Sequence, residues 1–440
     1  MRLERAQLGL LAALAATIPL SIFASEAFLV LSVLVLAARL AARNTRFPAT
    51  PLDVPIVCLV VWTLLAASFA RDPALSHEDA KKLVLFALFY VAVEVLARGV
   101  DRERALSAAL LGGLALAGLM VLQRHVLGYD TLDRRPSGFL GHYMSASGVT
   151  MGVLLLAVAR LAFGPRSRPR AVGFALPALV LAGVGAVALA TAAGHGVAAT
   201  RACVAALGAL AAAVALSRSA AVIAAGAALP AVTVPVAAWA LGASQTRSAW
   251  VGALAGLVLL ALLRAPRLLW LVGGAVLAVL VLRPAAVTER LTIGDASSRD
   301  RYYMWQAGLD MVLDKPVFGQ GPGMILAEYP RYRWPEATHP MQPHLHNNLL
   351  QVAAERGLPA LAFLLWWAVV AFAAALREAQ RSGVAAGGAG WPAAGALAGL
   401  AAVFAAGLFE YNLGDSEVLM LCLLFTAVPF ALARERAAAA

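Results

Sequence analysis

Two histidines and two asparagines stand together at the start of a long apolar run, in residues 343–357 (PHLHNNLLQVAAERG). A histidine has an unperturbed pKa near about 6.5, so it can take up a proton at neutral pH and act as a general base. His346, the second of the two, is the candidate base. The plainer alternative is that His344 and His346 only cap the helix that follows. The arginine-rich, aromatic segment just before them favours the catalytic role.

The chain is too apolar to form a soluble globule with a polar surface. Its 440 residues are 62% hydrophobic and 13% charged, which indicates a polytopic membrane protein. Apolar runs of about 17 to 23 residues, long enough to cross a hydrocarbon layer of about 30 Å, recur between short polar breaks. The predicted fold class is all-α, with about 12 to 14 transmembrane helices. The predicted spans lie near residues 8–24, 27–42, 52–70, 82–97, 105–123, 144–163, 171–190, 197–216, 219–241, 248–263, 268–285, 347–375, 392–409 and 416–433.

The spans divide the chain into two membrane parts and one large extramembrane loop. Residues 1–285 are expected to hold the first eleven helices, residues 286–346 the loop, and residues 347–440 the last three helices. In residues 171–241, weakly apolar Ala-rich sequence leaves a re-entrant segment open as an alternative to three crossings. The N-terminal run is interpreted as a first transmembrane helix, because no small-residue cleavage signature follows it. The three cysteines lie in apolar spans and form neither a disulfide framework nor a zinc-ligand pattern.

Arginines and lysines predict the orientation in the membrane. With the N-terminus in the cytoplasm, the basic clusters of the short loops fall on the inside, as the positive-inside rule requires. These clusters are Arg39/Arg43/Arg46, Arg98/Arg102/Arg104, Arg166/Arg168/Arg170, Arg264/Arg267, Arg377/Arg381 and Arg434/Arg436. The large loop then lies on the outer side, and the outer segments are basic too. The formal net charge of +11 therefore also indicates an anionic partner at the outer face.

The large loop is predicted to form two surface helices joined by a turn. The first covers residues 298–315 and lies across the membrane surface, and the second covers residues 324–334. Between them, residues 318–323 (FGQGPG) lack the Lys-Ser/Thr pair of a phosphate-binding loop, so a tight turn is the prediction. The apolar face of the first helix is expected to carry Trp305, Leu309 and Val312.

Three segments together resemble the signatures of the O-antigen ligase and polymerase superfamily. They are residues 244–256 (SQTRSAWVGALAG), 299–323 (RDRYYMWQAGLDMVLDKPVFGQGPG) and 346–357 (HNNLLQVAAERG). In that family an arginine opens a helix at the outer face, a periplasmic loop carries a further arginine before an aromatic stretch, and a histidine follows the loop. The ligase pattern continues from this histidine to two glycines, and here Ala360 stands in place of the second.

The resemblance implies a glycosyltransferase of a Gram-negative inner membrane. Such an enzyme moves a glycan from undecaprenyl diphosphate to a hydroxyl of the lipid A-core oligosaccharide at the periplasmic face, with inversion and without a metal or other cofactor. It implies that His346 is the base, and that Arg247, Arg299 and Arg301 bind the diphosphate, which planar guanidinium groups contact in bidentate geometry. The expected partners are the two lipid-linked substrates and membrane lipids, with no nucleic acid, and the protein is expected to act as a monomer.

Seven further residues at the outer face are candidates for binding the acceptor or supporting the base: His344, His339, Asn347, Arg135, Lys81, Glu410 and Asp415. For Arg135 and Lys81, anchoring at lipid headgroups is the alternative. The turn containing Glu410 and Asp415 suits either an acceptor sugar or the orientation of His346. No metal site is predicted, because the histidines together with Glu336 match no common ligand spacing.

Two other functions fit parts of the same pattern. A polymerase of the same superfamily would extend one lipid-linked glycan with another. A transporter or flippase would place ionisable residues near the middle of the bilayer. The predicted helix interiors are nearly free of charge and the charged residues gather at one face, which favours catalysis over transport.

Overall fold

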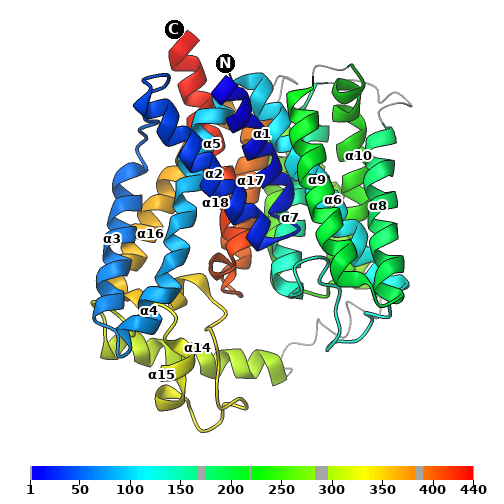
Figure 1. The fold of residues 1–440 in the computed structure, drawn as a ribbon. Coiled ribbons are helices and arrows are strands. Elements are labelled where there is room, and N and C mark those ends of the chain that lie inside the picture. The colour runs from blue at the N-terminus through cyan, green and yellow to red at the C-terminus, as the bar shows by residue number, and fades with distance from the viewer. Residues whose placement is uncertain (1, 166–173, 218–219, 283–295, 382–389, 440) are drawn as a thin grey trace.

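The computed structural model describes residues 2–165, 174–217, 220–282, 296–381 and 390–439, and these residues contain helices and no strand. Most of the long helices run between the two ends of one bundle (Figure 1). Both chain termini lie at one end, and the helices of the large loop lie at the other (Figure 1). We call these the terminal end and the loop end. The predicted all-α membrane fold is confirmed.

Every predicted span overlaps a helix. The helices of the membrane part are α1 (Arg2–Thr17), α2 (Ile22–Ala41), α3 (Asp53–Ser68), α5 (Ala87–Leu96), α6 (Gly99–His125), α7 (Tyr143–Phe163), α8 (Ala175–Ala192), α9 (Gly196–Leu216), α10 (Ala220–Ala243), α11 (Arg247–Arg264), α12 (Leu269–Leu282), α16 (Asn348–Arg381), α17 (Trp391–Ala406) and α18 (Ser416–Ala439). Within the described residues, α2, α6, α7, α8, α9, α11, α16 and α18 are long and apolar enough to cross a membrane. Shorter apolar stretches lie in α3, α10, α12 and α17.

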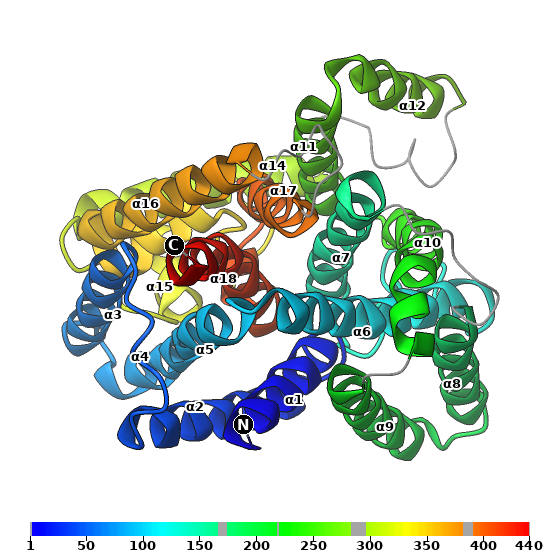
Figure 2. The ribbon, with the colours of Figure 1, turned by 90° about the horizontal axis from the view of Figure 1, so that it is seen from above.

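The Ala-rich stretch at 171–241 forms three separate helices, α8, α9 and α10, which pack beside α6 (Figure 2). The first three residues of that stretch lie outside the described residues. The same holds for the basic cluster Arg166/Arg168/Arg170, for residues 286–295 of the large loop and for most of the linker between α16 and α17.

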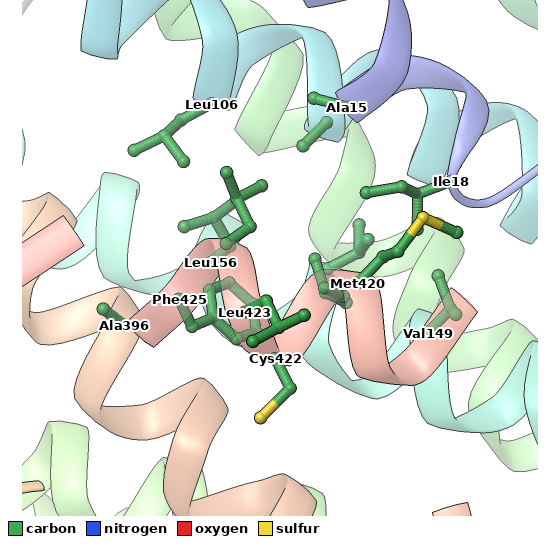
Figure 3. Close-up of a cluster of buried hydrophobic side chains, with 14 of the residues drawn as sticks. Ala15, Ile18, Leu106, Val149, Leu156, Ala396, Met420, Cys422, Leu423 and Phe425 are labelled. Carbon is green, nitrogen blue, oxygen red and sulfur yellow. The ribbon is translucent and has the colours of Figure 1, made fainter. Parts of the chain in front are cut away.

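The core of the bundle lies around α6, α7 and α18, which bury most of their residues, whereas α2, α8 and α9 bury few. Figure 3 shows Leu156 of α7 and Met420 and Phe425 of α18 packed with side chains from α1, α6 and α17. A Cβ at Gly399 of α17 would lie 2.3 Å from the ring of Phe425. A small residue at this contact lets the helices approach closely, as is common in membrane bundles. All three cysteines are free.

The loop end carries its own small core. Helices α14 (Ala296–Asp314) and α15 (Ile325–Tyr332) confirm the two predicted loop helices, and α4 (Pro73–Ala80) lies at the same end (Figure 1). The predicted apolar face of α14 is wrong at Leu309, which is 48% exposed. The face that packs inward carries Met304, Ala307, Met311 and Val312, because α14 packs on α16 as well as on α15.

Helix α16 breaks at Gly357, whose φ of 77° and ψ of 173° are not helical. A Cβ there would lie 1.9 Å from the carbonyl oxygen of Val317, so only glycine fits. The turn 318–323 packs into this break: the amides of Gln320 and Gly321 donate to the carbonyls of Ala354 and Glu355, both at 2.8 Å. Because these amides are used within the protein, residues 318–323 form a structural turn, as predicted, and not a phosphate loop.

Candidate active site

His346 and Glu410 form a hydrogen-bonded pair at the loop end. Nδ1 of His346 lies 2.8 Å from Oε1 of Glu410. Nε2 of His344 lies 3.4 Å from the same oxygen, and the two imidazole rings meet edge to face with their centroids 4.3 Å apart. A carboxylate only accepts, so Nδ1 of His346 carries the hydrogen, and in the neutral ring Nε2 is the basic nitrogen. This is the form that a general base needs.

Asn347, and not a histidine, caps α16. Its Oδ1 accepts hydrogen bonds from the amides of Leu349 and Leu350, both at 3.0 Å. Its Nδ2 donates to the carbonyl of Leu408 at 3.0 Å. The alternative that His344 and His346 cap this helix is therefore wrong. Asn347 instead holds the segment that carries His346 against the turn that carries Glu410.

Asn348 ties the same two segments together from inside. Its amide donates to the carbonyl of Gly407 at 2.7 Å, and its Nδ2 donates to Oδ1 of Asn412 at 2.7 Å. Its Oδ1 accepts from the amide of Leu413 at 3.2 Å. The turn between α17 and α18 is thereby fixed on both sides of Glu410.

Glu410 is a buried carboxylate held in its charged form. Burial alone raises the pKa of this group, but the hydrogen bonds and charges of His344 and His346 outweigh it, and the pKa of Glu410 falls below its usual range. Its other oxygen, Oε2, is buried and has no hydrogen-bond partner within the described part of the chain. Glu410 therefore places a negative charge directly beside Nδ1 of His346.

The second predicted acid of this turn, Asp415, lies on the other side of Glu410. It accepts a hydrogen bond from Oγ of Ser145 at 2.9 Å, and Ser145 also lies 3.3 Å from Nδ1 of His142. Burial raises the pKa of Asp415, and the charge of Glu410 raises it further, while the bond from Ser145 lowers it. Asp415 belongs to the polar surroundings of the base without contacting His346 through a hydrogen bond.

Two cavities bring the predicted arginines to the base. One, of about 280 Å³, is lined by Met144, Asp300, Arg301, Met304, Thr338, His339, Gln342 and His346. The other, of about 330 Å³, is lined by Arg247, Ser248, Val251, Arg301, Tyr302, Trp305 and Phe409. Arg301 lines both, so the two cavities adjoin at this residue, with Arg247 in one and His346 in the other.

Arg247 stands at the first position of α11, where backbone amides face outward without intrahelical partners. The preceding Thr246 makes no side-chain cap to the helix; its Oγ1 lies 2.9 Å from Oγ of Ser147 instead. Gln245 holds the turn in a left-handed conformation, with φ of 52°. A guanidinium and an uncapped helix N-terminus at one cavity favour an anionic ligand.

The remaining predicted residues lie outside these two cavities, apart from His339. His339 is largely exposed, and its Nε2 lies 3.6 Å from Oδ2 of Asp300. Arg299 is exposed on α14 and lines neither cavity. The guanidinium of Arg135 stacks over the ring of Tyr143 at 3.3 Å. Lys81 is exposed and pairs with Glu78 at 3.6 Å. The geometry thus separates Arg247 and Arg301 from the other basic candidates.

Some residues of the site were not predicted. Asp300 accepts from the amide of Thr338 at 2.9 Å and from Nε2 of Gln342 at 3.2 Å, which folds residues 338–342 over the smaller cavity. Nε1 of Trp305 donates to the carbonyl of Leu345, next to the base, at 3.0 Å. The sequence signal for both was their place on α14, with Asp300 directly before Arg301 and Trp305 about one helical turn after it.

One group of ligand-type side chains meets at the base. His344, His346 and Glu410 each offer one ligand atom, and these three atoms lie within 4.8 Å of one another. Two imidazoles and a carboxylate form a donor set that suits Zn²⁺ or a similar ion. Of the four side chains considered from the sequence as ligands, His344 and His346 belong to this group, whereas His339 and Glu336 do not. The prediction of a metal-free reaction stays a prediction.

Comparison with known proteins gives one family. Residues 231–365 match the Wzy-C family, described as O-antigen ligase. The matched region contains Arg247, Arg301 and His346 and ends before Glu410. No curated protein matched the chain. The resemblance predicted from the motifs is confirmed over residues 231–365, which are similar to the O-antigen ligase family.

Proposed function

We propose that this protein is an O-antigen ligase that transfers a glycan from undecaprenyl diphosphate to the lipid A-core oligosaccharide. The observation that carries the proposal is that Arg247 and His346 line two cavities that adjoin at Arg301. A lipid diphosphate is a concentrated anion, and a transferase must hold it beside a base that activates the acceptor. The two cavities supply both requirements side by side.

In the proposed reaction the two arginines hold the leaving group. Arg247 and Arg301 bind the diphosphate, and the amides at the start of α11 add to the positive field. The bond between the anomeric carbon and the diphosphate oxygen breaks, and undecaprenyl diphosphate leaves with the electron pair. Arginine suits this role because its guanidinium stays charged and matches phosphate geometry.

His346 activates the acceptor. Nε2 of His346 takes the proton of the acceptor hydroxyl while the hydroxyl oxygen forms a bond to the anomeric carbon. Attack from the side opposite to the leaving group inverts the anomeric carbon in a single displacement. The charge of Glu410, 2.8 Å from Nδ1, stabilises the imidazolium that forms and keeps the ring in the productive orientation.

The proposed site faces the periplasm. The site lies at the loop end, opposite both termini (Figure 1), and the basic short loops predict that the termini are cytoplasmic. The proposed location is the bacterial inner membrane, with the protein acting as a monomer. The glycan is then joined on the side of the membrane where lipid-linked polymer and lipid A-core meet.

Purified protein in lipid vesicles tests the proposal. It is given lipid-linked glycan and lipid A-core, and the products are separated by gel electrophoresis and mass spectrometry. A ligase yields lipid A-core enlarged by the glycan, together with one undecaprenyl diphosphate for each transfer. Failure to modify lipid A-core in the presence of intact donor contradicts the proposal.

A polymerase is the second candidate, because the family comparison does not depend on the acceptor. A polymerase would leave lipid A-core untouched and lengthen the lipid-linked glycan. In a strain that lacks the protein, loss of all capped lipopolysaccharide bands supports the ligase, and bands that carry a single repeat support the polymerase. In the same vesicle assay, a transporter would move the lipid-linked glycan from one leaflet to the other and would break no bond.

A further inference from the structure

A chain of buried hydrogen bonds runs from the glycine turn to the residue before the base. The amide of Gly323 donates to Oε1 of Glu355 at 3.0 Å. Nε2 of Gln351 donates to the same oxygen at 2.8 Å, and the amide of Leu345 donates to Oε1 of Gln351 at 2.7 Å. Both side chains are almost completely buried. The turn at Gly323 and the segment before His346 are therefore joined through two side chains of α16.

The direction of every bond in this chain is fixed by chemistry. The amide of Leu345 only donates, so Oε1 of Gln351 must accept from it and the NH₂ group of Gln351 is left to donate to Oε1 of Glu355. Gln351 and Glu355 stand four residues apart and share one face of α16. Both lie on the loop-end side of the break at Gly357, in the segment whose carbonyls bind the turn 318–323.

The chain ends at a strained position. His346 has a φ of 48°, a conformation that side-chain-bearing residues seldom adopt and that persists only where neighbours hold it. Asn347 holds the backbone on one side, through the α16 cap. Gln351 holds it on the other side, through the amide of Leu345. In this backbone conformation the imidazole of His346 faces Glu410. An extended backbone would direct the side chain elsewhere.

We propose that Gln351 and Glu355 are positioning residues, which fix the backbone turn at His346 by tying it to the glycine turn 318–323. They touch no substrate. Their role rests on the proposed function of His346 as the base. Because the bonds run through the turn 318–323, displacement of that turn would also displace the base.

Removing the bonds of this chain tests the arrangement. Gln351→Glu places two carboxylates face to face, and Glu355→Leu removes the oxygen that accepts from both Gly323 and Gln351. Each of these changes is expected to lower kcat by about 10- to 100-fold with the KM of the donor little changed, because small misplacements of catalytic groups are costly. Glu355→Gln is the conservative variant and is expected to keep most of the rate, because its side-chain oxygen can accept both bonds.

A second measurement is independent of activity. Amide hydrogen exchange of the peptide covering residues 340–349 is expected to accelerate in Gln351→Glu and Glu355→Leu and to stay near the wild-type rate in Glu355→Gln. Absence of transferase activity in the wild-type protein would defeat the proposed function and leave this exchange result intact. Normal kcat and normal exchange in Gln351→Glu and Glu355→Leu, or a loss in Glu355→Gln as large as that in Glu355→Leu, would overturn the positioning role.

Glu378→Leu is the matched control. Glu378 is also a buried glutamate of α16, but it lies near the terminal end, where its Oε1 accepts from Nη2 of Arg436 at 2.6 Å. Its replacement is expected to lower thermal stability without changing kcat or the exchange of residues 340–349. A drop in kcat as large as that of Glu355→Leu would mean that the loss of any buried glutamate of α16 has the same effect, and would contradict a specific role.

Discussion

Glu410 accepts a hydrogen bond from Nδ1 of His346 at 2.8 Å, across 64 positions of sequence. The pair joins the segment before α16 to the turn between α17 and α18, so the base and the acid behind it come from different hairpins of the bundle. Catalysis in the proposed reaction therefore depends on how these two segments are held together.

Replacing the acid tests the pair directly. Glu410→Gln is expected to lower kcat by about 10²-fold, because an uncharged amide no longer stabilises the imidazolium and its NH₂ group opposes the donors of the histidines. The measurement is kcat in reconstituted vesicles, with KM for the donor as the internal control. A variant with full kcat would show that the ring needs no carboxylate behind it.

The two histidines are expected to differ. His346→Ala should lose about 10²- to 10⁴-fold in rate, the usual effect of removing a general base, while it remains inserted and binds the lipid-linked donor. His344→Ala should lose less, because His344 only supports Glu410. The rates are compared in a purified assay alongside donor binding. Near-normal turnover of His346→Ala would exclude this residue as the base.

The arginines test the diphosphate site. Arg247→Ala is expected to lower transfer by about 10²- to 10³-fold, as when a preorganised charge contact is removed, and Arg247→Lys should recover only part, because an ammonium does not reproduce the planar fork. Arg301→Ala should act like Arg247→Ala. Arg299→Ala is the comparison, since Arg299 lines neither cavity. A larger loss from Arg299→Ala than from Arg301→Ala would reverse the assignment.

The charge of Glu410 gives a pH dependence of stability. Its folded-state pKa lies below the unfolded value of about 4.3, so its contribution is present above that value and is lost as the pH falls through the lowered folded-state pKa. Glu410→Gln is therefore expected to unfold at lower temperature than the wild-type protein at pH 7. The difference should shrink as the pH falls below about 4. The measurement is the thermal unfolding temperature of the two proteins in detergent, at pH 7 and at a pH below about 4. An unfolding-temperature difference that stays the same at both pH values would contradict a charged Glu410.

The reaction is predicted to need no metal. A chelator should leave transfer unchanged, since the proposed mechanism draws its positive charge from arginines and its base from His346. The two imidazoles and the carboxylate at the base make this prediction worth testing. Activity is measured after chelation and after adding back Zn²⁺ or Mg²⁺. Loss of activity on chelation, restored by one ion, would replace the metal-free mechanism.

Much of this architecture follows from local sequence patterns. Apolar runs predicted the membrane helices because a spanning helix needs a minimum apolar length, and helix signals predicted α14 and α15. The motifs also predicted Arg247, Arg301 and His346, since each stands in a short recognisable segment. The structure adds that these three residues line adjoining cavities.

Local sequence patterns did not predict the contacts that hold the segment around His346. Asn347 and Asn348 bind a turn some sixty positions away. The bond between Leu345 and Gln351 depends on the packing of α14 and the turn 318–323 against the start of α16. Leu309 was assigned to the wrong face for a related reason: periodicity gives the faces of a helix but not which neighbour each face meets.

The break at Gly357 has a mechanical consequence for the enzyme in its bilayer. The amides of Gln320 and Gly321 bond to carbonyls on one side of the break, and the amide of Leu358, on the other side, bonds to the carbonyl of Pro316. The hydrogen-bond ladder of α16 is interrupted between them. Transmembrane helices tilt when the hydrocarbon thickness changes. We expect such a tilt to reach residues 348–356 less fully than it would through an unbroken helix.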